Sequence, residues 1–304
     1  MGPAISRQPP FQAASLPVKL NSVPISFCLL LTLAQQPGVL KTPDVDLATF
    51  VYGPPGTTTP VIVANGGPGL SHIYMVQNDV WTRLAKSRQI VFYDQRGTGK
   101  STRLAPNASQ EMTAQIADLE AVRAKFGFEK FSLVGDSYGG FLAMAYAAAH
   151  PEHIEKLILS DSPPPDMKKM SRVLSQVFPD ISTDRGSTPD EQMRHHFRML
   201  FYSEENRDAY LAGAKDLGYN PQVGAQVSRS AANLDLTPEL PRFKFPTLVI
   251  TGRYDMNVAP VNAWNIYKAI PGAKFVVFEK SGHLPSYEEP DKYVEVVNAF
   301  LNGR

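Results

Sequence analysis

The sequence predicts an α/β fold: a mostly parallel, doubly wound sheet with an inserted helical cap. After Pro43, short apolar runs alternate with stretches of helical character, the pattern of parallel strands covered by helices on both faces. Ile116, Leu119 and Val122 mark the apolar face of one such helix, and the small residues of 141–149 mark another. The expected strands are residues 48–52, 61–64, 89–93, 131–134, 157–159, 247–251 and 275–278.

The stretch 163–241 interrupts this alternation. It opens on three consecutive prolines and continues with polar, methionine-containing segments of helical character, such as 191–202, without a clear strand pattern. We therefore expect a helical cap over 163–241, inserted between a first part of the core at 38–162 and a second part at 242–304.

Composition excludes several classes of function. Lys and Arg total 30 and Asp and Glu total 29, so the net charge of +1 creates no field that would attract nucleic acid or an anionic membrane. The single cysteine, Cys28, excludes an intramolecular disulfide framework and a cysteine-rich metal site. His195 and His196 are adjacent and point to different sides of any helix, so we expect no metal and no other cofactor.

The N-terminal segment 1–34 has the pattern of a signal peptide. Basic residues precede an apolar stretch at 23–34, small residues surround a potential cleavage point after Ala34, and the first acidic residue is Asp44. The stretch is too short for a membrane span of roughly 20 residues. This pattern indicates export to the periplasm or the medium, whereas an uncleaved extension would leave the protein in the cytoplasm.

The strongest local signal is Gly135-Asp136-Ser137-Tyr138-Gly139, which lies between the expected strand 131–134 and the small-residue helix. Gly-x-Ser-x-Gly between a strand and a helix is typical of a nucleophile elbow, a sharp turn that exposes a serine hydroxyl. Ser137 is therefore the predicted nucleophile. A serine hydroxyl is a weak nucleophile, so this prediction requires a histidine base and an acid that orients it.

His283 is the predicted base, because it lies in a loop beyond the late strand 275–278 and follows the serine and the acid in chain order. A neutral His283 is required, so we expect activity to fall below pH roughly 6 to 7. Asp255, in the loop after strand 247–251, is the favoured acid, and Asp161, after strand 157–159, is the competitor.

The oxyanion hole is expected at the glycine-rich loop 65–69, which follows the strand 61–64. Glycines at a strand end let a backbone N–H face the negative oxygen that develops during acyl transfer. The predicted donors are the N–H groups of Gly67 and Tyr138.

With these residues in place, the chain resembles the proline iminopeptidase (prolyl aminopeptidase) family of α/β-hydrolases, which includes the tricorn-interacting aminopeptidases. The resemblance covers about 38–304 apart from the cap and rests on segments 66–69, 94–101, 117–120, 135–140 and 252–255. It implies the α/β-hydrolase fold and Ser137, Asp255 and His283 as the catalytic triad. It also implies that Asp94 and Arg96 hold loops together.

The departures from the family pattern fall where the substrate is chosen. Asn65 stands where the family usually has histidine, and Met256 follows the predicted acid where some peptidase members carry a carboxylate. The cap lacks the family's Trp-Glu motif. Glu204 and Glu205 are the nearest candidates for binding a substrate ammonium group, although neighbouring acids on a helix also occur as a solvated face. Gly66 is expected to border the bound substrate.

The expected function is a serine hydrolase that works through an acyl-enzyme. The resemblance favours an aminopeptidase that releases N-terminal proline or another small residue from short peptides. The alternative is a carboxylesterase or amidase that acts on small, uncharged acyl groups. A binding protein without catalytic activity on the same fold is the third possibility, and only this one would resist labelling by a fluorophosphonate. In each case the expected partner is a small molecule or short peptide.

Overall fold

A single mixed sheet organises the protein, whose structure is a computed structural model that describes residues 37–56, 58–101, 103–170, 173 and 187–303. Within these residues the sheet has eight strands, in the order β1-β2-β4-β3-β5-β6-β7-β8. The β1–β2 and β2–β4 pairs are antiparallel, and all others are parallel. The strands are β1 (Gly38–Lys41), β2 (Asp46–Tyr52), β3 (Val61–Ala64), β4 (Ile90–Tyr93), β5 (Phe131–Asp136), β6 (Ile154–Ser160), β7 (Thr247–Gly252) and β8 (Lys274–Phe278).

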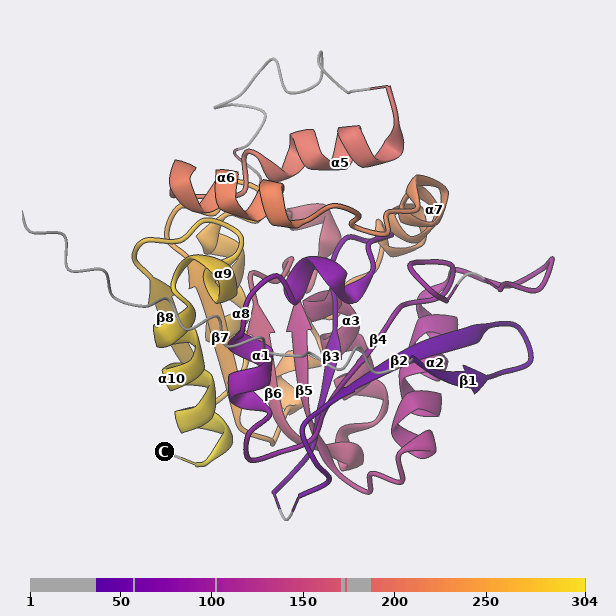
Figure 1. The fold of residues 1–304 in the computed structure, drawn as a ribbon. Helices are drawn as coiled ribbons and strands as arrows, with labels where there is room; N and C mark the ends of the chain where they lie inside the picture. Colours follow the sequence, from indigo (N-terminus) through magenta and orange to yellow (C-terminus); the bar gives the residue numbers. More distant parts are fainter. Residues whose placement is uncertain (1–36, 57, 102, 171–172, 174–186, 304) are drawn as a thin grey trace, which may run out of the picture. The chain divides into compact units, whose positions relative to one another are not determined.

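Helices cover both faces of this sheet (Figure 1). They are α1 (Val80–Leu84), α2 (Met112–Lys125), α3 (Tyr138–Ala149), α5 (Pro189–Phe197), α6 (Glu204–Gly213), α7 (Pro221–Ala231), α8 (Pro260–Ala269), α9 (Pro285–Glu288) and α10 (Pro290–Leu301). In β3, Ile62 and Ala64 belong to the apolar cluster that includes α2, α3 and α8. Val61 and Val63, which point to the opposite face, belong to the cluster that includes α1 and α10. Burial on both faces explains the continuous apolar runs in the sequence.

The predicted fold class is confirmed. Each of the seven expected strands is present: β3 has the expected ends, and the ends of the other six differ by one to three residues. The structure adds an eighth strand, β1 (Gly38–Lys41), which the sequence did not indicate because this edge strand is short and mostly exposed.

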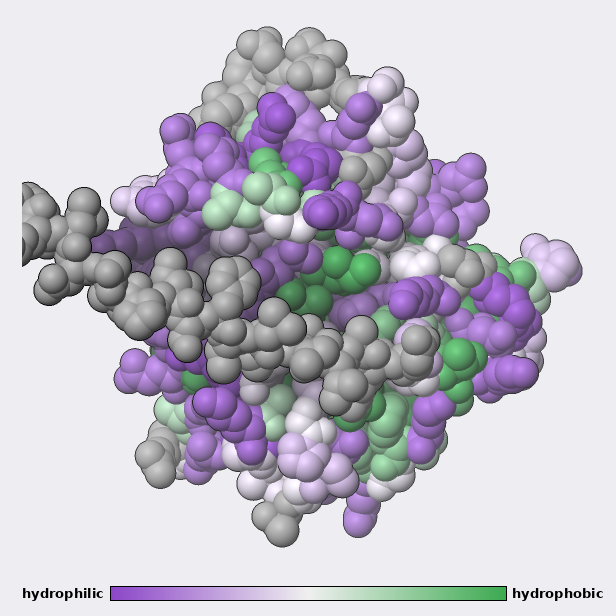
Figure 2. Space-filling model, in the orientation of Figure 1, coloured by the Kyte–Doolittle hydropathy of each residue, from purple (hydrophilic) through white to green (hydrophobic). Residues whose placement is uncertain are grey.

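The cap helices α5, α6 and α7 lie between β6 and β7 in the chain and above the carboxyl ends of the parallel strands (Figure 1). A capping box starts α5: Thr188 Oγ1 accepts from Glu191 N at 3.2 Å, and the Glu191 carboxylate accepts from Thr188 N at 3.0 Å. Val223 and Val227 of α7 pack into the apolar cluster below the cap. Hydrophilic residues predominate on the face of the cap that Figure 2 shows, as expected for helices with one face in solvent.

The predicted signal peptide, 1–34, lies outside the described residues, as does the segment 174–186 within the expected cap. Across the part of the chain that is described, no helix has the length and apolar character needed to cross a bilayer.

Candidate active site

Ser137 lies on the sharp turn between β5 and α3. Its backbone dihedrals are φ 51° and ψ −125°, a left-handed conformation that is strained for a residue with a side chain. The turn is tight, since a Cβ on Gly135 would lie 2.4 Å from the Gly139 carbonyl oxygen, and a Cβ on Gly139 would lie 2.0 Å from the carbonyl oxygen of Ala64 on the neighbouring strand β3. The Gly-x-Ser-x-Gly pattern therefore forms the expected strand-turn-helix, with the serine at the carboxyl end of the sheet.

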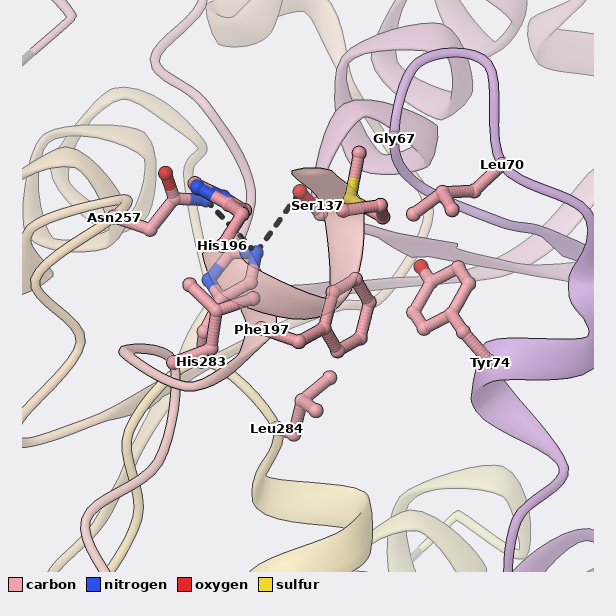
Figure 3. A pocket seen from close by; sticks show the side chains of 11 residues that line it. Gly67, Leu70, Tyr74, Ser137, His196, Phe197, Asn257, His283 and Leu284 are labelled. Atoms are coloured by element: carbon pink, nitrogen blue, oxygen red, sulfur yellow. Dashed lines mark hydrogen bonds between the residues drawn. The ribbon is translucent and has the colours of Figure 1, made fainter. Parts of the chain in front are cut away.

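Three loops bring the predicted triad residues together at this point. His283 Nε2 lies 3.0 Å from Ser137 Oγ (Figure 3). On the other side of the ring, His283 Nδ1 lies 2.6 Å from Asp255 Oδ2. The other oxygen of Asp255 accepts from Asn257 N at 2.9 Å and from Val258 N at 2.8 Å, which holds the carboxylate toward the imidazole. All three triad side chains are buried, with Ser137 the most exposed at 8%.

Acidic neighbours control the charge of His283. Burial lowers the pKa of the imidazole, but the charge and hydrogen bond of Asp255, together with the charges of Asp161 and Asp136, raise this pKa to about 9. The pKa of His283 therefore lies above the range of roughly 6 to 7 that the sequence alone suggested.

Asp161, the competing acid, lies close to the triad without a hydrogen bond to the imidazole. Its carboxylate accepts from Gly252 N and from Ser160 Oγ, both at 2.9 Å. A carboxylate oxygen of Asp161, a carboxylate oxygen of Asp255 and a ring nitrogen of His283 all lie within 4.8 Å of one another. Burial, with a further contribution from the charge of Asp255, raises the pKa of Asp161 well above its usual range. Of the two candidate acids, only Asp255 is bonded to His283.

The glycine-rich loop after β3 lies beside Ser137 because β3 and β5 are neighbours, with Ala64 opposite Gly135. Asn65 fixes this loop: its amide Nδ2 donates to the Gly66 carbonyl at 3.0 Å and to the Leu70 carbonyl at 2.8 Å. Gly67 and Ser137 border the same cavities, and Tyr138 opens α3, where a helix N–H has no partner within the helix. Gly67 and Tyr138, the two residues predicted to supply the oxyanion donors, therefore line one cavity together with Ser137.

Ser137 borders cavities on two sides in the described part of the chain. One, of about 60 Å³, lies on the His283 side and is lined mainly by apolar and aromatic side chains, including Leu70, Phe197 and Leu284 (Figure 3). The other, of about 410 Å³, lies on the Tyr138 side and is lined by residues such as Met167, Met170 and Ala231. None of the described residues that line either cavity is acidic.

The structure does not bring Glu204 and Glu205 to the nucleophile. Both are exposed residues in the first turn of α6, and the Glu204 side chain is 86% exposed. Glu204 borders a different cavity, of about 430 Å³, together with Tyr254 and Met256. Gly66, the third expected substrate-binding residue, does lie against Ser137, but its N–H already donates to the Tyr74 hydroxyl at 2.6 Å.

Sequence reasoning missed two buried acids that shape the site. Asp136 accepts a hydrogen bond from the Tyr74 hydroxyl, and burial raises its pKa to about 6. Glu288 joins the cap to the histidine loop: it accepts from Tyr202 N and Ser203 N, each at 2.9 Å, and from Gly282 N at 2.6 Å. No local pattern indicates these contacts, because the partners are distant in the sequence.

Asp94 and Arg96 bridge loops near the site. Asp94 accepts from His72 N at 3.0 Å and from Lys100 N at 2.8 Å, and Arg96 forms a bidentate pair with Asp118 at 2.7 Å. These contacts match the role in holding loops that the resemblance implies.

The sheet, the cap and the serine elbow together define the protein as an α/β hydrolase. The sequence model described as "alpha/beta hydrolase fold" matches residues 59–290, so the chain belongs to this family, among its prolyl aminopeptidase-like members. The proline iminopeptidase of Heyndrickxia coagulans is 30% identical over 269 residues, which cover 82% of this chain and 92% of the relative. The proline iminopeptidase of Saccharolobus solfataricus is 28% identical over 277 residues, which cover 83% and 87%.

Solved structures show the same fold. An esterase from a Rhodococcus species superposes with a TM-score of 0.73 at 23% identity, covering 87% of this chain and 98% of that one. An enol-lactonase from Burkholderia xenovorans superposes with a TM-score of 0.71 at 21% identity, covering 87% and 100%. These two matches carry information about the fold alone.

Proposed function

We propose that the protein is a serine hydrolase that cleaves an amide or ester bond through an acyl-enzyme on Ser137. The observation that carries this proposal is the hydrogen-bonded series Ser137, His283 and Asp255, with His283 Nε2 3.0 Å from the hydroxyl and Nδ1 2.6 Å from the carboxylate. Nucleophile, base and orienting acid in this geometry activate a serine hydroxyl.

In the proposed reaction, Ser137 Oγ attacks the carbonyl carbon while His283 Nε2 takes its proton. The carbonyl oxygen becomes negative and accepts hydrogen bonds from the N–H groups of Gly67 and Tyr138. The tetrahedral intermediate then collapses, and the leaving group departs with the proton that His283 returns. A water molecule next gives a proton to His283 and attacks the acyl-enzyme, which releases the acid and restores Ser137.

The first candidate substrate is a short peptide with an N-terminal proline or another small residue. The names of the relatives support it, since several proline iminopeptidases align over most of the chain. Such a substrate carries an ammonium group beside the scissile bond. Because an unpaired buried charge costs several kcal/mol, this candidate requires a carboxylate that pairs with the ammonium group.

The second candidate is an ester or amide with a neutral acyl group. Its support is the composition of the two cavities beside Ser137, whose described lining residues include no carboxylate that could pair with an ammonium group. Met167, Met170 and Ala231 instead offer an apolar surface.

A turnover panel separates these candidates. Prolyl and alanyl arylamides should be measured beside their N-acetylated forms and beside short acyl esters. Preference for the free amines supports the aminopeptidase, and preference for the N-acetylated forms or esters supports the neutral acyl group.

The Ser137→Ala variant tests the mechanism itself. Because the acyl-enzyme cannot form without the hydroxyl, we expect turnover to fall by about 10³-fold or more with the fold retained. A fluorophosphonate should label the unmodified protein and not this variant. An active Ser137→Ala variant would contradict the mechanism, and absence of both turnover and labelling in the unmodified protein would favour a binding protein.

A further inference from the structure

The Tyr74 hydroxyl bridges the two segments that form the proposed oxyanion hole. It accepts a hydrogen bond from Gly66 N at 2.6 Å and donates a very short one to Asp136 Oδ2. Gly66 immediately precedes the proposed donor Gly67, and Asp136 immediately precedes the nucleophile Ser137. One hydroxyl therefore connects the glycine-rich loop to the elbow.

The contact leaves the loop little freedom. A Cβ on Gly66 would lie 2.6 Å from the Ser137 Cβ and 2.8 Å from the Tyr74 hydroxyl, so only glycine fits between the nucleophile and the tyrosine. The peptide that carries the Gly67 N–H is held on both sides: Asn65 Nδ2 donates to its carbonyl, that of Gly66, at 3.0 Å, and the Tyr74 hydroxyl accepts from the N–H of the preceding peptide at 2.6 Å. The direction of the Gly67 N–H therefore depends in part on the Tyr74 hydroxyl.

The tyrosine itself is held by the cap. Tyr74 is 4% exposed, and its ring packs edge-on against Phe197 of α5 with centroids 6.0 Å apart. The Tyr210 hydroxyl of α6 donates to the Tyr74 carbonyl at 2.9 Å. In Figure 3 the Tyr74 ring borders the cavity beside Ser137. Burial, together with the charge of Asp136, raises the pKa of Tyr74 well above its usual range, so the hydroxyl keeps its proton for Asp136.

We propose that Tyr74 is a positioning residue that aims the Gly67 N–H at the oxyanion by linking Gly66 to Asp136. This inference rests on the proposed function of Ser137. Tyr74 does not itself contact the reacting atoms, because its hydroxyl is engaged as acceptor and as donor. The Tyr74 hydroxyl should therefore stabilise the transition state, in which the substrate oxygen becomes negative, and should not affect binding of the neutral substrate.

The test compares two inhibitors on the Tyr74→Phe variant, which keeps the ring and removes the hydroxyl. In a phenylethyl trifluoromethyl ketone, Ser137 Oγ bonds to the carbonyl carbon, its proton moves to His283, and the carbonyl oxygen becomes an oxyanion in the hole. The matching methyl ketone mimics only the neutral substrate. We expect Tyr74→Phe to weaken inhibition by the trifluoromethyl ketone about tenfold or more and inhibition by the methyl ketone less than about twofold. For turnover, kcat should fall with little change in KM.

Tyr146→Phe is the matched control. Its buried hydroxyl donates to Glu120 Oε2 at 2.6 Å, away from Ser137, so this variant should leave the ratio of the two inhibition constants unchanged. Partial unfolding of a variant would weaken inhibition by both ketones by the same factor, so it does not change the ratio of the two inhibition constants. Equal weakening of both ketones by Tyr74→Phe, or no weakening of either, would overturn the proposal.

Tyr210→Phe supplies a second arm if Tyr74→Phe does not fold. It removes the hydrogen bond to the Tyr74 backbone and leaves the Tyr74 hydroxyl in place. If Tyr210→Phe weakens inhibition by the trifluoromethyl ketone more than inhibition by the methyl ketone, by a smaller factor than Tyr74→Phe would, the proposal is supported. Equal weakening of both ketones, or no weakening, counts against it. If the unmodified protein is neither active nor labelled by a fluorophosphonate, the proposed function fails; if it is active and the inhibitor ratio is unaffected, only the role of Tyr74 fails.

Discussion

Raising the pH should activate this enzyme well beyond neutrality. The proposed base must be neutral to accept the Ser137 proton, yet the surrounding carboxylates, with Asp255 foremost, raise the pKa of His283 from 6.5 to about 9 against the effect of burial. The sequence alone suggested loss of activity only below pH roughly 6 to 7.

The size of the effect follows from the pKa. With a pKa of about 9, roughly one molecule in a hundred has a neutral His283 at pH 7. We expect kcat/KM to rise about tenfold per pH unit from pH ~6 to pH ~8 and to level off above pH ~9.

The same titration affects stability, and its sign is fixed by the direction of the shift. The pKa of folded His283 lies above that of the unfolded chain, so protonation stabilises the fold. This contribution is fully present below pH 6.5 and is lost as the pH rises through about 9. A shift of this size corresponds to roughly 3 kcal/mol of the free energy of unfolding.

The assay should use an N-acetylated arylamide, which has no titrating group of its own, over pH ~5.5 to ~10 with the uncatalysed rate subtracted. Enzyme returned from each pH to a common buffer must recover its activity, so that irreversible loss is not read as titration. A plateau reached by pH ~7.5 would refute the reasoning, because His283 would then titrate near its ordinary value.

Three further predictions concern the acids around the site. Asp255→Asn should lower kcat by about 10³-fold or more, because the substitution disturbs the tautomer of the His283 imidazole, and should leave the circular dichroism spectrum unchanged. A loss of kcat below tenfold would indicate that Asp161 can replace Asp255. Asp136→Asn should stabilise the fold, and the gain in free energy of unfolding should be larger at pH 8 than at pH 5 by about 1 kcal/mol. The reason is that burial raises the pKa of folded Asp136 from 3.8 to about 6, so ionisation at higher pH costs stability; thermal melts with a gain independent of pH would contradict this. If prolyl arylamides are turned over, Glu204→Gln and Glu205→Gln should each change KM less than about twofold, because these side chains are exposed and do not border the Ser137 cavities; a tenfold rise would restore their role in binding the ammonium group.

Local patterns predicted the elements that carry the site. The strand Val61–Ala64 agrees at both ends with the expected range, because four consecutive apolar residues are bounded by proline and by a glycine-rich loop. The elbow at Ser137 was equally predictable, since its glycines and the flanking strand and helix are contiguous in the chain. The edge strand Gly38–Lys41 was not, because its exposed residues show neither a buried run nor a clear alternation.

Contacts between distant segments could not be predicted in this way. Tyr74 and Asp136 are 62 residues apart, and Glu288 reaches Tyr202 across 86 residues. Their side chains are ordinary polar residues in the sequence, and only the tertiary fold turns them into buried partners: Tyr74 and Asp136 meet within the core, and Glu288 joins the core to the cap. The same holds for Glu204, an acid of the expected cap that was a candidate for binding the substrate, whereas the structure places it at another cavity.

The sequence by itself determined the class of fold, the position of the Ser137 elbow and the loops that carry His283 and Asp255. Each of these depends on residues adjacent in the chain or on the order in which parallel strands follow one another. Tertiary structure alone decided which acid bonds to the imidazole: Asp161 and Asp255 both follow strands, but only Asp255 is held toward Nδ1 by the N–H groups of its own loop. It also decided the surroundings of His283, whose pKa is raised by three buried acids of separate segments, Asp255, Asp161 and Asp136. Such convergence depends on distances across the sheet, which no local pattern in the sequence records.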